Sequence, residues 1–420
     1  MKAIFFLFVM LIQNDLCYSG WAIQNSGTQA DLFDVLYLTE TTGIVVGGKV
    51  GDEYGIILRT TNAGQSWDSV YGGSRLLRGI AFTDVNTGFV VGNTGAILKT
   101  TNGGINWSQL NSGTTQHLRS VSFPPTATGF TGFVCGFSGM MLKTEDGGAN
   151  WITQQTGVTK VLFSIHFYDA VTGISVGGDN SLGDQPVILK TTNGGMNWIS
   201  QTSPLPFALR GIFLIDQNNS FAAGNDNALI RTSNGGSNWN SVTLPGSRYL
   251  RDVYFQNNST GYVCGNFGYI IKTTDGGATW DTTASLTTRY LEAIHFLNVN
   301  SGSAVGHGGT ILKYTFLTGA LNSNTVVKDF NLSQNFPNPF NPSTVLKYEL
   351  GIEAGVTLKV FDLRGNVIKT LVNMKQQPGS YSVIFDKGDL PSGVYFYRLR
   401  VNTEDGTKSF SQTKQMMLLK

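Results

Sequence analysis

The chain is poor in charged residues, cysteine and histidine, and each shortage excludes a class of protein. Charged side chains make up 13% of the 420 residues, against roughly 25% in an average soluble domain. The formal net charge of +2 gives no reason to expect a nucleic acid or an acidic membrane as partner. The four histidines show no metal-ligand spacing and no Cys–His set accompanies them, so we expect no metal site and no cofactor. No phosphate-binding loop or serine-nucleophile motif stands out either.

Long apolar segments are also absent, apart from one at the start of the chain. Residues 1–19 have the pattern of a removable export signal: Lys2, an apolar run over residues 3–12, and the small residue Ser19 before a plausible cleavage point. The run of about ten residues is too short to span a bilayer, so we expect export. An uncleaved anchor is one alternative. A lipoprotein attached at Cys17 is another, but Asp15 and Leu16 match such a site poorly.

Glycine is abundant, with 52 residues, and one or two glycines lie in each copy of an eight-residue box that recurs six times and ends in tryptophan. Successive box tryptophans lie 40, 44, 47, 41 and 41 residues apart, the length of one four-stranded propeller blade. In each box we expect an Asn or Asp to cap a tight turn by bonding the backbone two residues on, and the glycines to supply positive φ. The tryptophan then packs between blades, so all these positions are structural. They are Asn62 and Trp67, Asn102 and Trp107, Asp146 and Trp151, Asn193 and Trp198, Asn234 and Trp239, and Asp275 and Trp280.

Around each box the sequence predicts four short antiparallel strands. In residues 77–110 they are 77–82, 88–92, 96–100 and a last one that begins at Trp107. The seventh repeat stops near residue 315 without a box, whereas the segment from Trp21 matches the one from Trp107. We therefore expect the N-terminal strand to complete the last blade and close a seven-bladed ring. The first strands begin at Leu32, Leu77, Leu118, Leu162, Leu209, Leu250 and Leu291.

Two cysteines follow the signal, Cys135 and Cys264, at equivalent places in different repeats. A disulfide needs α-carbons within about 7 Å of each other. We therefore expect two buried free thiols that act as small apolar residues.

The pattern changes after residue 315. Residues 316–328 read as a linker, and residues 329–420 contain a proline-rich segment followed by six short alternating runs between Gly, Asn and Pro turns. This pattern predicts a small Ig-like β-sandwich. The expected organisation is all-β: a signal at 1–19, a propeller over 20–315, a linker at 316–328 and a sandwich over 329–420.

Two resemblances rest on these motifs. The box resembles the Asp-box of bacterial neuraminidase repeats, and residues 21–315, with the pattern seen over 77–107, resemble photosystem II stability/assembly factor-like propellers. Residues 329–420 resemble the type A C-terminal sorting domain of the type IX secretion system, through the stretches 336–342, 360–365, 392–399 and 414–420. That likeness implies handling by the type IX machinery and export across the outer membrane to the cell surface. It also implies removal of the domain and attachment to surface lipopolysaccharide. A generic adhesion sandwich is the alternative.

Sites for chemistry are expected on the face that carries the first-strand entrances, at the mouth of the central channel. The second residue of each first strand varies around the ring, and four are arginines: Arg78, Arg119, Arg210 and Arg251. Guanidinium groups in such a ring suit a carboxylate, sulfate or phosphate. The alternative is that each arginine ties neighbouring blades together, through a carbonyl or an acid such as Asp252 or Glu292. The other three second residues are Phe33, Phe163 and Glu292.

The leading interpretation is a secreted, surface-delivered binding or scaffold protein, not an enzyme, whose partner is a glycan or a protein. A polysaccharide hydrolase is the second interpretation, since the long loops 47–55 and 177–187 carry Asp52, Glu53, Asp179 and Asp184 and a glycosidase needs two facing carboxyl groups. A photosystem assembly factor is the third, and the sorting tail argues against it.

Overall fold

A computed structural model describes most of the chain after the signal. The described residues are 20–51, 54–124, 130–179, 185–244, 248–315, 330–335, 338–341, 343–376, 378–387, 390–403 and 409–419. The predicted export signal and linker therefore lie outside the described residues. Two compact units divide the chain, one over 19–316 and one that contains 317–420.

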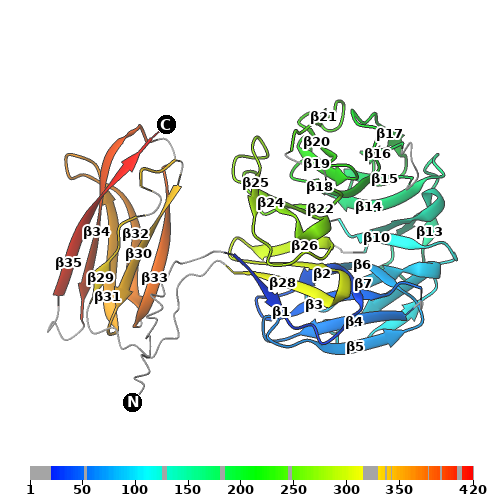
Figure 1. The fold of residues 1–420 in the computed structure, drawn as a ribbon, viewed down its shortest axis with the longest axis horizontal. Coiled ribbons are helices and arrows are strands. Elements are labelled where there is room, and N and C mark those ends of the chain that lie inside the picture. The colour runs from blue at the N-terminus through cyan, green and yellow to red at the C-terminus, as the bar shows by residue number, and fades with distance from the viewer. Residues whose placement is uncertain are drawn as a thin grey trace, which may run out of the picture. The chain divides into compact units, whose positions relative to one another are not determined.

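The first unit is a ring of seven four-stranded antiparallel sheets, the predicted propeller (Figure 1). The blade strands in chain order are β2 (Asp31–Tyr37), β3 (Gly43–Lys49), β4 (Tyr54–Thr60), β5 (Asp68–Gly73); β6 (Leu77–Phe82), β7 (Gly88–Gly92), β8 (Ala96–Thr100), β9 (Ser108–Leu110); β10 (Leu118–Ser122), β11 (Gly132–Gly136), β12 (Met141–Thr144), β13 (Ile152–Thr153); β14 (Val161–Phe167), β15 (Gly173–Gly178), β16 (Val187–Thr191), β17 (Ile199–Ser200); β18 (Leu209–Leu214), β19 (Ser220–Gly224), β20 (Leu229–Thr232), β21 (Asn240–Ser241); β22 (Leu250–Phe255), β23 (Gly261–Gly265), β24 (Ile270–Thr273), β25 (Asp281–Thr283); and β26 (Leu291–Asn298), β27 (Ser301–Gly306), β28 (Thr310–Thr315) with β1 (Gly20–Gln24). Four short 3₁₀ turns, η1 (Asn93–Gly95), η2 (Phe137–Gly139), η3 (Asn266–Gly268) and η4 (His307–Gly309), join second to third strands. The described residues contain no helix with the length and apolarity that a bilayer crossing requires.

The N-terminal strand closes the ring, as the sequence predicted. β1 pairs antiparallel with β28, with Trp21 opposite Tyr314, and Figure 1 shows the two strands side by side. The Trp21 ring is 4% exposed and packs against Tyr314, Phe296 and Tyr262, with centroids 5.2, 5.8 and 6.4 Å away. Because Tyr262 belongs to the sixth blade, this single strand joins the last two blades.

Apolar clusters between adjacent blades form the core. In one of them Phe133 of the third blade stacks on Phe167 of the fourth at 4.2 Å, and Trp198 meets both rings edge-on. Phe89, Phe123 and Trp151 repeat this arrangement one interface earlier. The box tryptophans therefore bury apolar area between blades, as predicted. Cys135 and Cys264 are buried free thiols in the same clusters.

The box turn differs in one detail from the expectation. In the second box the Asn102 carboxamide oxygen accepts the backbone N–H of Asn106, four residues on rather than two. The nearer N–H groups, of Asn102 and Gly104, donate to the Thr100 hydroxyl. The Asn102 side chain therefore bonds the N–H of Asn106 instead. Gly103 and Gly104 have φ of 66° and 79°, the left-handed conformation expected of the glycine pair.

A repeated tie between blades was not predicted. Each third strand carries a Lys or Arg one residue before its end or, in β28, two residues before it. Arg59 Nε donates to the Gly103 carbonyl of the next blade at 2.8 Å, Lys99 Nζ to Gly147 at 2.7 Å and Lys190 Nζ to Gly235 at 2.5 Å. These charge-assisted bonds fasten one blade to the box turn of the next.

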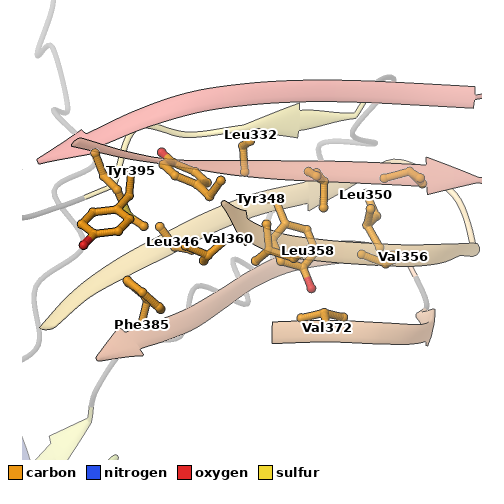
Figure 2. Close-up of a cluster of buried hydrophobic side chains, with 14 of the residues drawn as sticks. Leu332, Leu346, Tyr348, Leu350, Val356, Leu358, Val360, Val372, Phe385 and Tyr395 are labelled. Carbon is orange, nitrogen blue, oxygen red and sulfur yellow. The ribbon is translucent and has the colours of Figure 1, made fainter. Parts of the chain in front are cut away.

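The second unit is the predicted sandwich of two sheets. One has the order β29 (Asn331–Leu332), β30 (Ser343–Leu350), β33 (Gly379–Asp386), and the other β32 (Val367–Gln376), β31 (Ala354–Phe361), β34 (Gly393–Asn402), β35 (Ser409–Leu418). Inward residues of both sheets, such as Tyr348, Leu358 and Phe385, form one apolar core (Figure 2). Each predicted alternating run coincides with one of these strands, although the runs over 356–362 and 416–419 extend one residue past β31 and β35, and β35 begins well before its run.

Candidate functional site: the channel mouth

A β-bulge at the same position of all seven first strands prepares the channel mouth. The second residue of each first strand is skipped in its pairing with the second strand, for example Arg119 between Leu118 and Ser120. The same shift occurs in the other six blades. A bulge leaves its extra residue unpaired and re-aims the side chain, which turns all seven second-position side chains toward one mouth.

Those side chains line a single cavity of about 380 Å³. Its walls are Phe33, Val50, Arg78, Arg119, Phe163, Arg210, Arg251, Glu292 and His307. The structure therefore brings together the four predicted arginines and the three other second-position residues. Val50 and His307 were missed. His307 could have been found, because it occupies the loop position that holds Asn225 and Asn266 in the two preceding repeats.

Two of the arginines are hydrogen-bonded within their own blade. Arg210 Nε donates to Asn225 Oδ1 at 3.1 Å, and Arg251 Nε to Asn266 Oδ1 at 3.3 Å. Arg251 also lies 3.8 Å from a Glu292 oxygen. Because Glu292 belongs to the next blade, the contact between Arg251 and Glu292 is a tie of the expected kind. Asp252 takes no part in it, because its carboxylate accepts the backbone N–H groups of Val253 and Ile294.

Aromatic rings support the guanidinium groups. The Arg78 guanidinium lies 3.9 Å from the centroid of the Phe33 ring, and that of Arg210 lies 4.0 Å from Phe163. Such cation–π contacts hold the planar groups in place without neutralising their charge.

The charge of Arg119 is poorly compensated by the described residues around it. In its blade Phe137 replaces the asparagine that bonds Arg210 and Arg251, and the guanidinium lies between Phe137 at 4.7 Å and Phe163 at 6.0 Å. Its buried Nε finds no hydrogen-bond acceptor among the described residues. Burial, followed by the charge of Arg78, lowers the pKa of Arg119 to about 9. An anion in the cavity would relieve both costs.

Glu292 supplies the negative charge of the mouth. Its Oε1 lies 2.8 Å from His307 Nε2. Burial acts to raise the pKa of Glu292, but the hydrogen bond from His307 and the charge of Arg251 outweigh it, and the pKa is lowered. The same hydrogen bond raises the pKa of His307. The cavity therefore contains four guanidinium groups and one carboxylate, and that carboxylate already contacts Arg251 and His307. The net charge of the cavity is positive.

The predicted loop acids do not form a comparable site. Asp179 is half-buried and does not line the mouth cavity, and Asp52, Glu53 and Asp184 lie outside the described residues. Within the described ranges, no three His, Cys, Asp or Glu side chains gather in a metal-binding group. His166 instead stacks on Phe213 of the next blade at 4.7 Å, and His295 lies 5.2 Å from Tyr254.

In the sandwich, two stretches quoted for the sorting domain meet. Phe340 of the proline-rich segment donates its N–H to the Met417 carbonyl at 2.9 Å and accepts from Leu419 at 3.0 Å. The Asn338 side chain accepts the Met417 N–H at 2.8 Å. Phe340 and Leu418 are both buried in the core, so the start and the end of this unit are held together.

Comparison with known proteins gives two family matches. Residues 72–158 match the family described as photosynthesis system II assembly factor YCF48, and residues 334–411 match the secretion system C-terminal sorting domain. No curated protein matches the chain in sequence.

Solved structures share the fold at low sequence identity. YCF48 bound to D1 peptide aligns over 71% of this chain and 96% of its own, with TM-score 0.59 and 19% identity. YCF48 from Cyanidioschyzon merolae aligns over 70% and 99%, with TM-score 0.57 and 19% identity. PorZ of Porphyromonas gingivalis, described as an essential surface component of the type-IX secretion system, aligns over 95% of this chain and 60% of its own, with TM-score 0.53 and 11% identity. The chain therefore combines a propeller with YCF48-like repeats and a secretion-system C-terminal sorting domain that directs it to the cell surface.

Proposed function

We propose that the propeller is a surface-displayed binding or scaffold module, not an enzyme, and that its channel mouth binds an anionic group of a glycan or protein. The sorting domain supports the location of this activity. The mouth supports its chemistry, because the cavity concentrates four guanidinium groups around space of about 380 Å³.

The state of Arg119 is the observation that carries the proposal. A buried guanidinium with an unsatisfied Nε costs free energy, and stacking on Phe137 and Phe163 does not supply an acceptor. A carboxylate, sulfate or phosphate accepts two parallel N–H bonds from such a group. The rings beside it offer apolar faces to the part of the ligand that carries the anion.

The comparisons allow two sources for the anionic group. A peptide is the ligand named for one YCF48 structure, which supports a polypeptide carboxylate. Delivery to the cell surface supports an acidic glycan.

Binding of the full chain to a glycan array and to surface extracts tests the proposal. We expect Arg119→Gln to weaken binding by about tenfold or more, because one charge-assisted hydrogen bond contributes roughly 1.5–3 kcal/mol. Arg231→Gln is the matched control, since Arg231 is exposed and does not line the mouth. Unchanged binding after all four mouth arginines become Gln would overturn the proposal.

The same glycans test the non-enzymatic part. We expect no release of reducing sugar from any of them. Release that Asp179→Asn abolishes would instead favour a hydrolase.

A further inference from the structure

The interface between the seventh and first blades differs from the other six at its centre. In the other interfaces the second-strand residue that pairs with the Lys or Arg of the third strand is large and apolar or aromatic, and packs toward the next blade. These residues are Ile44, Phe89, Phe133, Ile174, Phe221 and Tyr262, and at the closing interface the residue is Ser303. Replacing a phenyl ring by a hydroxymethyl group removes most of the volume that fills this position elsewhere.

Polar groups surround Ser303. Its cross-strand neighbours are His295 and Lys313, and Tyr37 of the first blade lies opposite, with its ring centroid 3.6 Å from Lys313 Nζ. Tyr37, Ser303 and Lys313 are 3%, 0% and 6% exposed. Two buried atoms here, His295 Nδ1 and Lys313 Nζ, make no hydrogen bond within the described part of the chain. The hydroxyl groups of Tyr37 and Ser303 have no described partner other than each other.

The closing strand explains why Lys313 faces inward. Lys99 and Lys190 occupy the position equivalent to Lys313 in their own blades. Each donates to a backbone carbonyl in the box turn of the next blade. In the first blade the equivalent carbonyl is that of Ala63, and Gln24 of β1 donates to it at 3.2 Å. Lys313 therefore loses its usual acceptor, and the acid that acts on its charge is Glu40, an exposed loop residue.

We propose that this buried cluster between the seventh and first blades is a binding site for a small inorganic anion of the size of chloride. The ammonium group of Lys313 and the hydroxyls of Tyr37 and Ser303 all donate, and His295 donates in its Nδ1–H tautomer. When Ser303 and Tyr37 bond each other, one hydroxyl still donates outward, so an anion accepts from it, from Lys313 and from His295, and neutralises the buried charge. A water molecule accepts only two hydrogen bonds and leaves the charge, and a metal cation is repelled by Lys313. Burial lowers the pKa of Lys313 to about 8, so the amine is still largely protonated at neutral pH.

Thermal unfolding of the full chain in sodium bromide, against sodium gluconate at the same ionic strength, tests the site. Because bromide binds only the folded ring, we expect the Tm of the propeller transition to rise by about 2–4 °C for each tenfold increase above the Kd. Lys313→Met and Ser303→Phe, which restores the ring found at other interfaces, should both abolish the rise. Lys190→Met is the matched control: it loses a tie at another interface and should keep the bromide response.

Anomalous diffraction from crystals grown in bromide supplies a readout that does not depend on how stable the variants are. We expect a peak within hydrogen-bond distance of Lys313 Nζ and of at least one of the two hydroxyls, Tyr37 OH and Ser303 Oγ. A water or an empty site there, or a bromide response that Lys313→Met and Ser303→Phe leave unchanged, would overturn the proposal.

Discussion

Glu292 and His307 form a half-buried pair in the channel mouth, with 2.8 Å between Oε1 and Nε2. The carboxylate is 16% exposed and the imidazole 35%. Arg251 Nε lies 3.8 Å from the other carboxylate oxygen, Oε2. Glu292 therefore connects Arg251, one of the four mouth arginines, to His307 of the last blade.

This pair should make the stability of the propeller depend on pH. The pKa of His307 is raised above 6.5 by Glu292, so its contribution is complete below pH 6.5 and is lost as the pH rises through the raised pKa. The pKa of Glu292 is lowered from 4.5, so its contribution is complete above pH 4.5 and is lost as the pH falls through the lowered pKa. The pair therefore stabilises the fold most between pH 4.5 and 6.5. The difference in unfolding free energy between wild type and His307→Gln, measured by urea denaturation from pH 5 to 9, should shrink with increasing pH; a constant difference would contradict this.

Removing the closing tryptophan should destabilise the ring strongly. Trp21→Ala deletes a buried indole that contacts three aromatic rings, and we expect a loss of about 3–5 kcal/mol in urea unfolding. Ile23→Ala, on the same strand but 61% exposed, is the control and should change stability by less than about 0.5 kcal/mol. Equal effects of the two variants would mean that β1 does not hold the ring closed.

A substitution in the first box turn should stabilise the propeller. Ala63 has φ of 59° at the position where the second box has Gly103 with φ of 66°. A side chain in this left-handed conformation costs about 1 kcal/mol, so Ala63→Gly should stabilise the propeller by a few tenths to 1 kcal/mol, after the entropy that glycine adds to the unfolded chain. The reciprocal change Gly103→Ala should destabilise by about 1 kcal/mol. Calorimetry of both variants checks the sign, and destabilisation by Ala63→Gly would refute the argument.

Surface delivery should depend on the sandwich. Deleting residues 329–420 removes the region that contains the sorting-domain match, and we expect the remaining propeller to stay in the periplasm. Protease treatment of intact cells, followed by immunoblotting, distinguishes the two locations. Arg119→Gln in the full chain is the control, because it alters only the mouth and should reach the surface normally. Delivery of the truncated chain would contradict the assignment.

The sequence predicted the repeating parts of the fold and missed details set by partners distant in the chain. Regularly spaced boxes and the match of Trp21 to Trp107 were enough for seven blades and their closure. The bulges beside Leu118 and its six equivalents were not predictable, because a bulge is defined by the strand opposite and not by its own residues. The carbonyl partner of Lys99 lies 48 residues away, and only the structure identifies it.

For the candidate site, comparison between repeats identified the four arginines but not the hydrogen-bond and aromatic partners of their guanidinium groups. The variable second positions located Arg78, Arg119, Arg210 and Arg251, and the cavity contains all four. That Arg210 is bonded to Asn225 whereas Arg119 lies between two phenyl rings depends on a second variable position, in the loop after the second strand. Comparing that position across repeats would also have found His307.

The pairing of β1 with β28 has a consequence for how the protein matures. Trp21 and Tyr314 are about 290 positions apart, so the ring cannot close until nearly the whole propeller has been synthesised, and a contact of such high contact order forms slowly. Until β28 has been synthesised, β1 has no partner strand and the last blade stays incomplete. Ring closure is therefore a late step in the folding of the propeller.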